Sequence, residues 1–139
     1  MTQRTLSIVK PDATKRGITG EINAMVEAGG LAIVAQKRIR LTREQVEGIY
    51  GEHSGQPWFP EQVAYMLSGP VVAQVVEGED AVARLRGIMG PTDFTKAPPG
   101  TIRRRFALSY RENCMHGSDS VESAAREIPI LFRDDEIVG

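Results

Sequence analysis

Glycine and proline cut this chain into short segments, and this punctuation restricts the possible folds more than any other feature of the sequence. The strongest breaks are Pro11, Gly29-Gly30, Gly69-Pro70 and Gly90-Pro91. Proline lacks a backbone N–H and glycine favours helix ends, so both terminate strands and helices. The apolar runs between the breaks are far shorter than the ~20 residues of a membrane-spanning helix. Because the chain has 139 residues, we expect a single domain of short elements over residues 1–139.

Strand patterns are recognisable between these breaks. Short apolar or alternating runs predict strands at residues 5–9, 31–41 and 71–76. Residues 106–110 fit a strand or a short helix equally well.

Helical spacing and capping residues place the helices between the strands. Apolar residues three and four apart predict helices that begin near Thr19, Asp80 and Asp119, each a typical N-cap residue. Thr42 with Gln45 forms a capping box for another helix, and Pro60 can open the next, which makes a helical hairpin.

The resulting order is strand, helix, strand, hairpin, strand, helix, strand, helix. Without the hairpin and the last helix it is β-α-β-β-α-β, the ferredoxin-like plan of an α+β protein, in which an antiparallel sheet carries its helices on one face. Residues 91–101, PTDFTKAPPGT, form a long loop before the last strand. Long ordered loops in compact domains are often functional, so we expect this one to be an active-site loop.

The net charge of −1 conceals blocks of charge along the chain. Residues 1–43 carry a net +5 and residues 84–111 a net +6, whereas residues 44–80 carry −7 and residues 112–139 carry −5. A near-neutral total excludes a general polyanion binder, but the basic blocks leave room for one local phosphate pocket.

Several common functional signatures are absent. The single cysteine, Cys114, rules out an internal disulfide and a multi-cysteine metal site. There is no GxxxxGK[ST], GxGxxG, HExxH or CxxC motif, so any phosphate binding uses other groups. The first residues hold a short apolar run followed by a proline, which does not fit a signal peptide, and we expect a cytoplasmic protein.

His116 is the first candidate for chemistry. It lies in the segment 113–120, NCMHGSDS, between an apolar segment and the predicted last helix. It is either an ordinary loop histidine or a nucleophile, since a neutral imidazole attacks well near pH 7. Glu127, on the following helix, is either a solvated helix charge or the carboxylate that fixes the imidazole tautomer.

Basic and aromatic residues are candidates for contacts to phosphate or to a base. Arg86, Thr92 and the run Arg103–Arg105 lie in one basic block, where they form either a phosphate site or a solvated basic stretch. Lys10, at a strand end, is either a surface lysine or a ligand contact. Trp58 either covers the core or offers a platform for a nucleotide base.

Four segments, in order, resemble the nucleoside diphosphate kinase family. They are IVKPD at 8–12, GPVV at 69–72, GTIR at 100–103 and NCMHGSDSVES at 113–123, and the similarity runs from about residue 4 to residue 137. The last segment is similar to the family's stretch around its phosphorylated histidine. Four ordered matches in one chain argue against coincidence.

This resemblance implies a phosphotransferase with a ping-pong mechanism. The enzyme would move the γ-phosphate of a nucleoside triphosphate to a nucleoside diphosphate through a phosphohistidine, and so maintain the NTP and dNTP pools. By motif position, His116 is implied to be the nucleophile and to attack through Nδ1. Glu127 and Ser118 would hold the other ring nitrogen, and Tyr50 would lie beside the ring.

The resemblance also assigns the nucleotide contacts. Lys10 and Asn113 would contact the ribose hydroxyls and the phosphate end of the nucleotide. Arg86, Thr92 and Arg103 would hold the β and γ phosphates. Mg²⁺ would bridge those phosphates and be held mainly by the nucleotide itself, so no metal-ligating side chain is expected.

The chain departs from the family pattern in and around the implied base site. Trp58 stands where the family usually has a phenylalanine that stacks on the base. Gln62 replaces a base-flanking leucine, Tyr110 replaces a small apolar residue, and Phe94 stands where the loop usually has a proline. We hypothesise that Trp58 and Tyr110 clamp the base between them.

The implied partners are nucleoside triphosphates, nucleoside diphosphates and further copies of the chain. Family members are tetramers or hexamers, and a chain that ends at Gly139, short of the tail of longer members, favours a tetramer over a hexamer. Stacking and sugar contacts do not identify a base, so broad nucleotide specificity is implied.

The alternative is a catalytically silent nucleotide- or nucleic-acid-binding module on the same fold. An RNA-recognition module would need aromatic side chains on its strands, and only Phe106 and Tyr110 are candidates, so no specific nucleic acid is expected. A silent module would not need His116 within its complete motif, which favours the enzyme.

Overall fold

The computed structural model describes residues 1–139 and contains four strands, seven α-helices and three short 3₁₀ helices. In chain order the elements are β1 (Thr2–Val9), α1 (Pro11–Lys15), α2 (Thr19–Ala28), β2 (Ala32–Ile39), α3 (Arg43–Tyr50), η1 (Gly51–His53), α4 (Phe59–Met66), β3 (Val71–Glu79), α5 (Ala81–Met89), η2 (Phe94–Lys96), α6 (Ile102–Phe106), β4 (Met115–Gly117), α7 (Val121–Leu131) and η3 (Asp134–Glu136).

The four strands form one antiparallel sheet in the order β2-β3-β1-β4. Strand β1 is central and pairs with β3 along its whole length, from Thr2 opposite Glu79 to Val9 opposite Val72. Its other edge holds β4, in which His116 lies opposite Ile8. This arrangement confirms the ferredoxin-like α+β fold predicted from the order of the elements.

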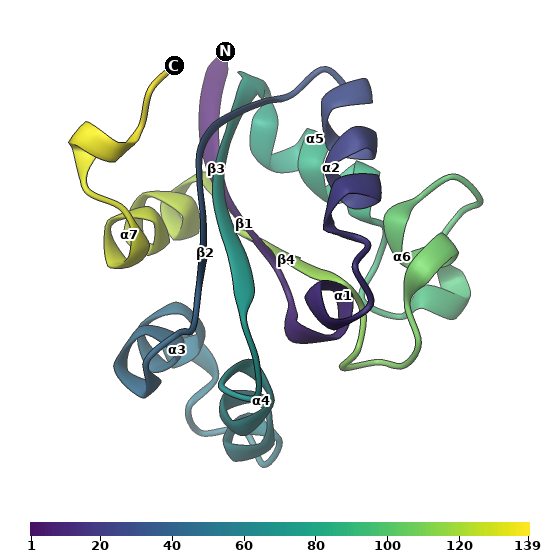
Figure 1. The fold of residues 1–139 in the computed structure, drawn as a ribbon, viewed down its shortest axis with the longest axis vertical. Coiled ribbons are helices and arrows are strands. Elements are labelled where there is room, and N and C mark those ends of the chain that lie inside the picture. The colour runs from purple at the N-terminus through teal and green to yellow at the C-terminus, as the bar shows by residue number, and fades with distance from the viewer.

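Helices cover both faces of the sheet (Figure 1). The two crossover helices, α2 and α5, lie together on one face as predicted, over a core that includes Val9 and Val76. The hairpin helices α3 and α4, together with α7, complete a second core on Leu6 and Ile8. Because β1 is covered on both faces, its last five residues are all buried, including the polar Thr5 and Ser7, and burial does not alternate along them.

The last strand differs from the prediction in position. Residues 106–110 do not form a strand, because helix α6 ends at Phe106 and an irregular loop follows. The fourth strand is β4, which is only three residues long and contains His116. A strand this short has too few residues to show alternation in a sequence.

The hairpin begins as its capping residues predicted. The Thr42 hydroxyl accepts from the Gln45 amide, and the Gln45 side chain accepts from the Thr42 amide, which confirms the capping box of α3. Pro60 lies in the first turn of α4, where its missing N–H costs no helical hydrogen bond.

Three other predicted N-caps differ in detail from those of the structure. Helix α2 begins at Thr19 itself, so the capping position falls on Ile18. Asp80 is the N-cap residue of α5, as predicted, but it adopts a left-handed backbone with φ of 49° and its side chain accepts no capping hydrogen bond. Helix α7 is capped by Ser120, one residue after the predicted Asp119, through a hydrogen bond from the Ser123 amide.

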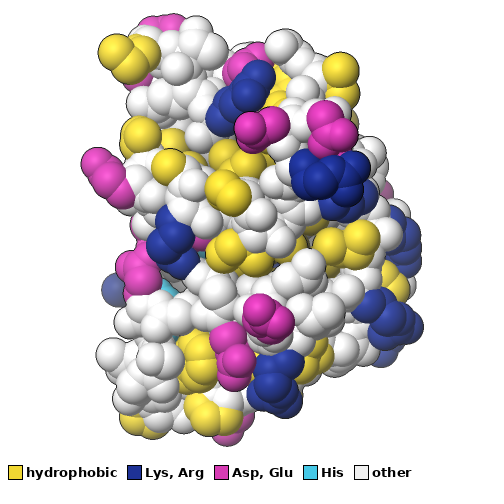
Figure 2. Space-filling view, turned by 90° about the vertical axis from the view of Figure 1, so that its left-hand side faces the viewer, with side chains coloured by type: hydrophobic (Ala, Val, Ile, Leu, Met, Phe, Trp, Pro, Cys, Tyr) yellow, Lys and Arg dark blue, Asp and Glu magenta, His cyan; other side chains and the backbone are white.

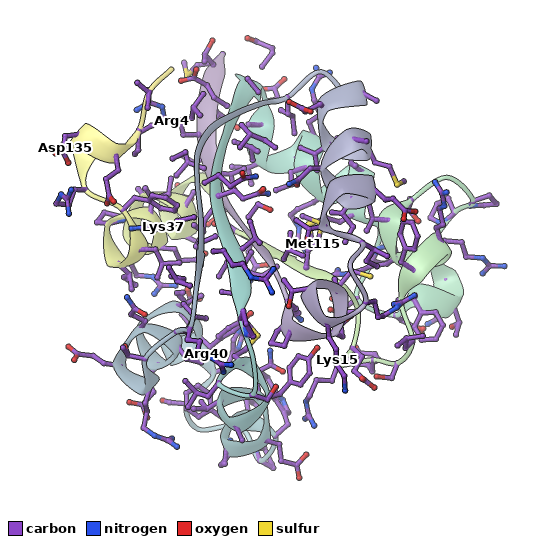
Figure 3. The ribbon with its side chains drawn as sticks, in the orientation of Figure 1. Arg4, Lys15, Lys37, Arg40, Met115 and Asp135 are labelled. Atoms are coloured by element: carbon purple, nitrogen blue, oxygen red, sulfur yellow. The ribbon has the colours of Figure 1, made fainter.

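The charge blocks of the sequence pair with one another in the fold. Arg4 contacts Glu77 and Lys37 contacts Glu136, so each of these ion pairs joins a basic block to an acidic one. On the molecular face shown in Figure 2, acidic and basic side chains are accordingly interspersed with apolar ones. In Figure 3, Arg4, Lys37 and Asp135 lie on the α7 side of the sheet, while Met115 lies on the opposite side.

None of the helices combines the length and the hydropathy that would let it cross a membrane.

Candidate functional site

A cleft of about 680 Å³ opens at the end of the sheet where β1 runs into α1. Its wall is built from the hairpin α3–α4, helix α5, the loops around α6, strand β4 and helix α7. Nine of the ten side chains predicted to form the site line this cleft: Lys10, Tyr50, Trp58, Arg86, Thr92, Arg103, Asn113, His116 and Glu127. The tenth, Ser118, is buried behind Glu127.

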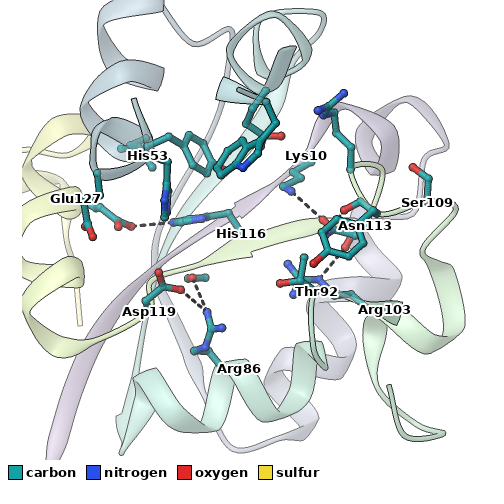
Figure 4. Close-up of a pocket in the computed structure, with 18 residues that line it drawn as sticks. Lys10, His53, Arg86, Thr92, Arg103, Ser109, Asn113, His116, Asp119 and Glu127 are labelled. Atoms are coloured by element: carbon teal, nitrogen blue, oxygen red, sulfur yellow. Dashed lines mark hydrogen bonds and ion pairs between the residues drawn. The ribbon is translucent and has the colours of Figure 1, made fainter. Parts of the chain in front are cut away.

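His116 and Glu127 form the centre of the site (Figure 4). His116 Nε2 lies 2.8 Å from Glu127 Oε1, and the Ser118 hydroxyl donates to the same oxygen at 2.8 Å. Strand β4 presents His116 toward the α7 side because its neighbours, Met115 and Gly117, face the opposite core.

The ionised state of Glu127 determines the tautomer of His116. Burial alone would raise the pKa of Glu127, but the hydrogen bonds from His116 and Ser118 and the charge of Arg126 outweigh burial, so its pKa lies below the ordinary value. The carboxylate is therefore an acceptor, and Nε2 of the imidazole must carry the proton. Nδ1 then holds the free lone pair, and no group of the chain donates to it.

Tyr50 packs edge-on against His116, with ring centroids 5.3 Å apart. Its hydroxyl is buried without a hydrogen-bond partner in the chain. Burial raises the pKa of Tyr50, so the hydroxyl stays protonated and cannot serve as a base at neutral pH. The Tyr50 ring limits the rotation of His116, and the unpaired Tyr50 hydroxyl is left to bind a ligand.

Arg103 is held in place by backbone carbonyls. Its guanidinium donates to Asn113 O at 3.2 Å, to Gly90 O at 3.1 Å and to Met115 O at 2.7 Å. The side chain is almost fully buried, and burial together with the nearby charge of Arg86 lowers its pKa to about 10. Arg103 therefore remains a cation at neutral pH and also fixes the segment that leads into β4.

Lys10 is the second buried cation of the cleft. Its ammonium donates to Asn113 Oδ1 at 2.8 Å, which brings together the two residues predicted to contact the sugar and the phosphates. Burial and the nearby charge of Arg103 lower the pKa of Lys10 to about 7. The lysine thus lacks an anionic partner close enough to keep it fully charged.

Arg86 lies on the opposite wall and is partly exposed. It donates to Asp119 Oδ1 at 2.8 Å and to Gly117 O at 3.3 Å. Thr92 is exposed at the start of the 91–101 loop, which contains the short helix η2, begun by Asp93 through a hydrogen bond from the Thr95 amide. Phe94 belongs to that helix and does not line the cleft.

Aromatic side chains stand at the mouth of the cleft. Trp58 is 40% exposed and Tyr110 is 67% exposed, although both line the cleft, so each offers a ring face to a ligand. His53 packs against Trp58, with ring centroids 5.3 Å apart. Gln62 is buried in the same wall.

Sequence reasoning missed the residues that hold the site from behind. Asp12, buried at the start of α1, accepts from the Cys114 amide at 3.2 Å and from the Tyr65 hydroxyl. Arg126 contacts Glu127 Oε2 at 3.4 Å and donates to Gly48 O at 2.5 Å. Asp12 directly follows Pro11 at a predicted strand end, a position that could have indicated its role, but nothing in the sequence marks Arg126.

Cys114 is a structural residue of this segment. It adopts a positive φ of 82°, which is uncommon for a residue other than glycine. It is also fully buried. Burial raises the pKa of its thiol to about 12. The thiol is therefore not a reactive thiolate at neutral pH.

The charges of the cleft suit a polyphosphate. Four Lys or Arg side chains line one cleft: Lys10, Arg86, Arg103 and Arg111. No group of three or more His, Cys, Asp or Glu side chains is arranged to hold a metal ion. The arginine and lysine side chains suit the oxygens of a polyphosphate.

Known proteins match this chain over nearly its whole length. A family model described as nucleoside diphosphate kinase matches residues 3–137. The curated nucleoside diphosphate kinase of Maricaulis maris is 61% identical over 137 residues, which cover 99% of this chain and 98% of that protein. The enzyme of Rhodospirillum centenum is also 61% identical, with the same coverage.

Solved structures agree with this match. The nucleoside diphosphate kinase of Aquifex aeolicus superposes with a TM-score of 0.95 at 45% identity, and covers 99% of this chain and 100% of its own. The halophilic enzyme of Halobacterium salinarum, solved in complex with CDP, has a TM-score of 0.95 at 40% identity, and covers 100% of this chain and 93% of its own.

Proposed function

The chain belongs to the nucleoside diphosphate kinase family and is a phosphotransferase that acts on nucleotides, and from this premise we propose that His116 carries the phosphoryl group between them. The observation that supports this role most strongly is the 2.8 Å contact between His116 Nε2 and Glu127, which leaves the Nδ1 lone pair available to attack. No other histidine in the chain has a carboxylate partner.

In the first half-reaction, Nδ1 of His116 attacks the γ-phosphorus of a nucleoside triphosphate. The Nδ1–P bond forms while the bond from phosphorus to the β–γ bridging oxygen breaks, and the nucleoside diphosphate leaves with that oxygen. The imidazole gains positive charge during this step, and Glu127 stabilises it from the Nε2 side. A second nucleoside diphosphate then takes the phosphoryl group by the reverse sequence, which makes the mechanism ping-pong.

The cations of the cleft stabilise the transferred charge. Phosphoryl transfer depends mainly on positioning and on positive charge around the phosphate oxygens. We propose that Arg86, Thr92 and Arg103 hold the β and γ phosphates, and that Lys10 with Asn113 contacts the sugar and the phosphate end. Mg²⁺ bound to the nucleotide would neutralise further phosphate charge.

Arg86 must exchange partners when a nucleotide binds. It is paired with Asp119 in the structure, but a bidentate contact with phosphate is stronger than a partly exposed ion pair with a carboxylate. Asp119 therefore holds the arginine side chain near the phosphate site and releases it to the substrate.

The nucleoside end of the substrate is proposed to lie at the mouth of the cleft. Trp58 would stack on the base, with Tyr110 on the other side, and neither ring distinguishes one base from another. Trp58→Phe and Tyr110→Val should each weaken nucleotide binding, and unchanged affinities in both variants would remove the clamp. The CDP bound to the Halobacterium salinarum relative supports a nucleoside diphosphate as one ligand.

We further infer a single catalytic domain, a cytoplasmic location and assembly into a homo-oligomer, with a tetramer favoured over a hexamer. The match of one family model to residues 3–137 supports the single domain, and the resemblance to the family implies the location and the homo-oligomer. A measurement of mass in solution by light scattering tests the oligomer number.

The test of the mechanism is phosphorylation of the free enzyme. The protein is incubated with γ-labelled ATP and Mg²⁺ without an acceptor, and the expected product is an acid-labile, base-stable label that is transferred to added GDP. His116→Ala should abolish the label, whereas His53→Ala, which removes the other histidine, should retain it. An unlabelled wild-type protein would reject the phosphohistidine mechanism.

A further inference from the structure

One ion pair crosses the rim of the cleft. Arg111, in the irregular loop before β4, donates to Glu61 Oε2 at 3.1 Å, although the two residues are 50 positions apart in the sequence. Glu61 lies in the first turn of α4 and outside the lining of the cleft, whereas Arg111 lines it. No other side-chain hydrogen bond connects helix α4 with this loop.

The two ends of this ion pair are adjacent to the two aromatic side chains of the cleft mouth. Glu61 follows Trp58, the N-cap residue of α4, by three positions, and Arg111 directly follows Tyr110. The bond between Glu61 and Arg111 therefore ties together the backbone segments that carry the two rings. Without this bond, the loop and the hairpin would be joined only through the body of the protein.

Each of the two walls of the rim, the loop before β4 and helix α4, has hydrogen bonds of its own. The loop is braced by the Glu112 amide, which donates to the Ser109 hydroxyl at 3.0 Å, and by the Asn113 side chain, which donates to Tyr110 O at 3.0 Å. Helix α4 is braced by the hydrogen bond from Tyr65 to Asp12. The ion pair is therefore the one side-chain hydrogen bond that joins the two braced walls directly.

The arginine end of the pair is less exposed than the glutamate end. The Arg111 side chain is 34% exposed and that of Glu61 is 73% exposed. Arg111 Nε is buried and has no hydrogen-bond partner, so the aliphatic part of the side chain lies against the cleft wall and only the guanidinium tip reaches outward.

We propose that the Arg111–Glu61 ion pair is a latch that closes the base slot between Trp58 and Tyr110 and slows the release of bound nucleotide. It would thereby determine nucleotide affinity without taking part in phosphoryl transfer. This inference rests on the proposed position of the base at Trp58. The latch acts on the nucleoside end of any substrate, so it is expected to affect ATP and GDP alike.

The expected size of the effect follows from the exposure of the pair. Partly exposed ion pairs contribute about 0.2–1 kcal/mol, which corresponds to a change in rate of up to about fivefold. Exposed charges are also screened by salt, so the contribution of the latch should fall as ionic strength rises.

The experiment uses the intrinsic fluorescence of Trp58, the single tryptophan of the chain. ADP is bound to the full-length enzyme, then displaced rapidly, and the dissociation rate is read from the fluorescence change in stopped flow. Glu61→Gln and Arg111→Gln are each expected to raise this rate two- to fivefold and to raise the KM for ADP by a similar factor. The single-turnover rate of phosphorylation at saturating ATP should stay within twofold of the wild-type rate.

Glu21→Gln is the matched control, since it removes an exposed ion pair with Arg105, outside the lining of the cleft. It should leave the dissociation rate unchanged. In high salt the wild-type dissociation rate should approach that of Glu61→Gln, while the control continues to behave as the wild type does.

The double variant Glu61→Gln/Arg111→Gln separates a latch from a direct contact. If the two residues act through their bond, the double variant should release ADP no faster than either single variant. Additive effects would mean that Arg111 contacts the nucleotide on its own, and would overturn the latch, as would single variants that release ADP at the wild-type rate.

Failure of the latch can be told apart from failure of the proposed function. If wild-type protein is phosphorylated on His116 but Trp58 fluorescence does not respond to ADP, the base lies elsewhere and the latch is refuted while the chemistry stands. If no phosphorylation occurs, the phosphohistidine mechanism itself is wrong. A normal response of Trp58 with unchanged release rates in the variants refutes the latch alone.

Discussion

At the scale of single residues, the site is governed by what surrounds His116, and Glu127 is its closest partner. The carboxylate lies 2.8 Å from Nε2 and leaves Nδ1, the proposed nucleophile, without a partner in the chain. The Ser118 hydroxyl donates to the same oxygen, so two groups share the task of orienting the ring through one carboxylate.

Glu127→Ala should therefore lower turnover without abolishing it. The expected loss is about 10²-fold, at the low end of what a positioned acid–base group contributes, because the alanine variant keeps the nucleophile and loses only its orienting partner. Steady-state kcat and the rate of label formation on His116 are the measurements. Turnover equal to that of the wild type would remove Glu127 from the mechanism.

The lowered pKa of Glu127 also gives a pH dependence with a definite sign. A carboxylate whose pKa is depressed in the folded protein adds stability at pH above its unfolded value, and this contribution is lost as the pH falls through the folded pKa. In Glu127→Gln, the free energy of unfolding should consequently fall less steeply on acidification than in the wild type. Chemical denaturation at several acidic pH values measures the difference.

Lys10 is predicted to take up a proton when a nucleotide binds. Its pKa of about 7 leaves it largely neutral in the free protein at pH 8, and polyphosphate would restore the charge by raising that pKa. Calorimetry at pH 8 in buffers of different ionisation enthalpy should show uptake of nearly one proton per ADP, and little uptake at pH 6. Lys10→Met should remove the pH 8 uptake, and persistence of the full uptake in that variant would contradict the assignment.

The sequence indicates the residues that line the cleft better than the residues that support them from behind. His116 and Lys10 belong to short motifs, and the structure brings both to one cleft. Arg126 could not be found in this way. It contacts its neighbour Glu127 on α7 and donates to the carbonyl of Gly48 on α3, and only the tertiary fold brings these two helices together. An exposed arginine on a helix looks the same in a sequence whether or not it has such contacts.

At the scale of elements, strand β4 sets the position of the nucleophile, and its close packing on α5 is the point most open to test. A Cβ on Gly117 would lie 2.7 Å from Met89 Sδ and 3.2 Å from Leu85 Cδ2, which is closer than packed atoms approach. Neither of these side chains lies in open space, since both are buried in the core beneath the sheet.

Gly117→Ala should accordingly push β4 away from α5. The expected cost is about 1–3 kcal/mol of unfolding free energy, typical of overpacking, together with a loss of activity as His116 shifts relative to Glu127. Gly87→Ala, in the middle of α5, is the control: its Cβ would meet nothing within 4 Å, so the variant should gain about 0.5–1 kcal/mol from helix propensity. Equal stability of the two variants would show that the packing of β4 is looser than the structure indicates.

The three long strands were predicted well, and the shortest strand was not. Strands β1, β2 and β3 each have eight or nine residues, enough for an apolar pattern to be recognised. Strand β4 has three, and it forms because β1 leaves its edge open opposite Ser7–Val9. The cap of α7 was placed one residue early because Asp119 and Ser120 are both good N-cap residues, and the choice depends on the pairing of Asp119 with Arg86.

At the scale of the whole molecule, the cleft draws its walls from segments of both halves of the chain, so a bound nucleotide should stabilise the entire fold. Lys10 and Tyr50 come from the first half, and Arg86 and His116 from the second. The charge blocks noted in the sequence are distributed in the same way, since basic residues of one block pair with acidic residues of another. Charge blocks along the chain therefore do not become charge blocks on the surface. Basic side chains from three segments do meet in the cleft, where Lys10, Arg86, Arg103 and Arg111 line the wall.

ADP at about one hundred times its Kd should raise the unfolding free energy by about 2.7 kcal/mol, through preferential binding to the folded state. For a domain of this size the melting temperature should rise by roughly 10 °C. His116→Ala should show a similar rise, because it removes the nucleophile and keeps the cations and the base slot. A rise that disappears in His116→Ala would mean that the imidazole itself, and not the cations and the base slot, accounts for most of the binding of ADP.

The alternation of β4 has a consequence for how the gene can change over evolutionary time. Met115 and Gly117 face one core while His116, between them, faces the carboxylate of Glu127. Loss or insertion of one codon between Cys114 and His116 would turn the imidazole toward Leu85 and Met89 and bring a neighbour to the catalytic side, even though every functional residue would still be encoded. The length of this short stretch is therefore constrained as strictly as the identity of His116.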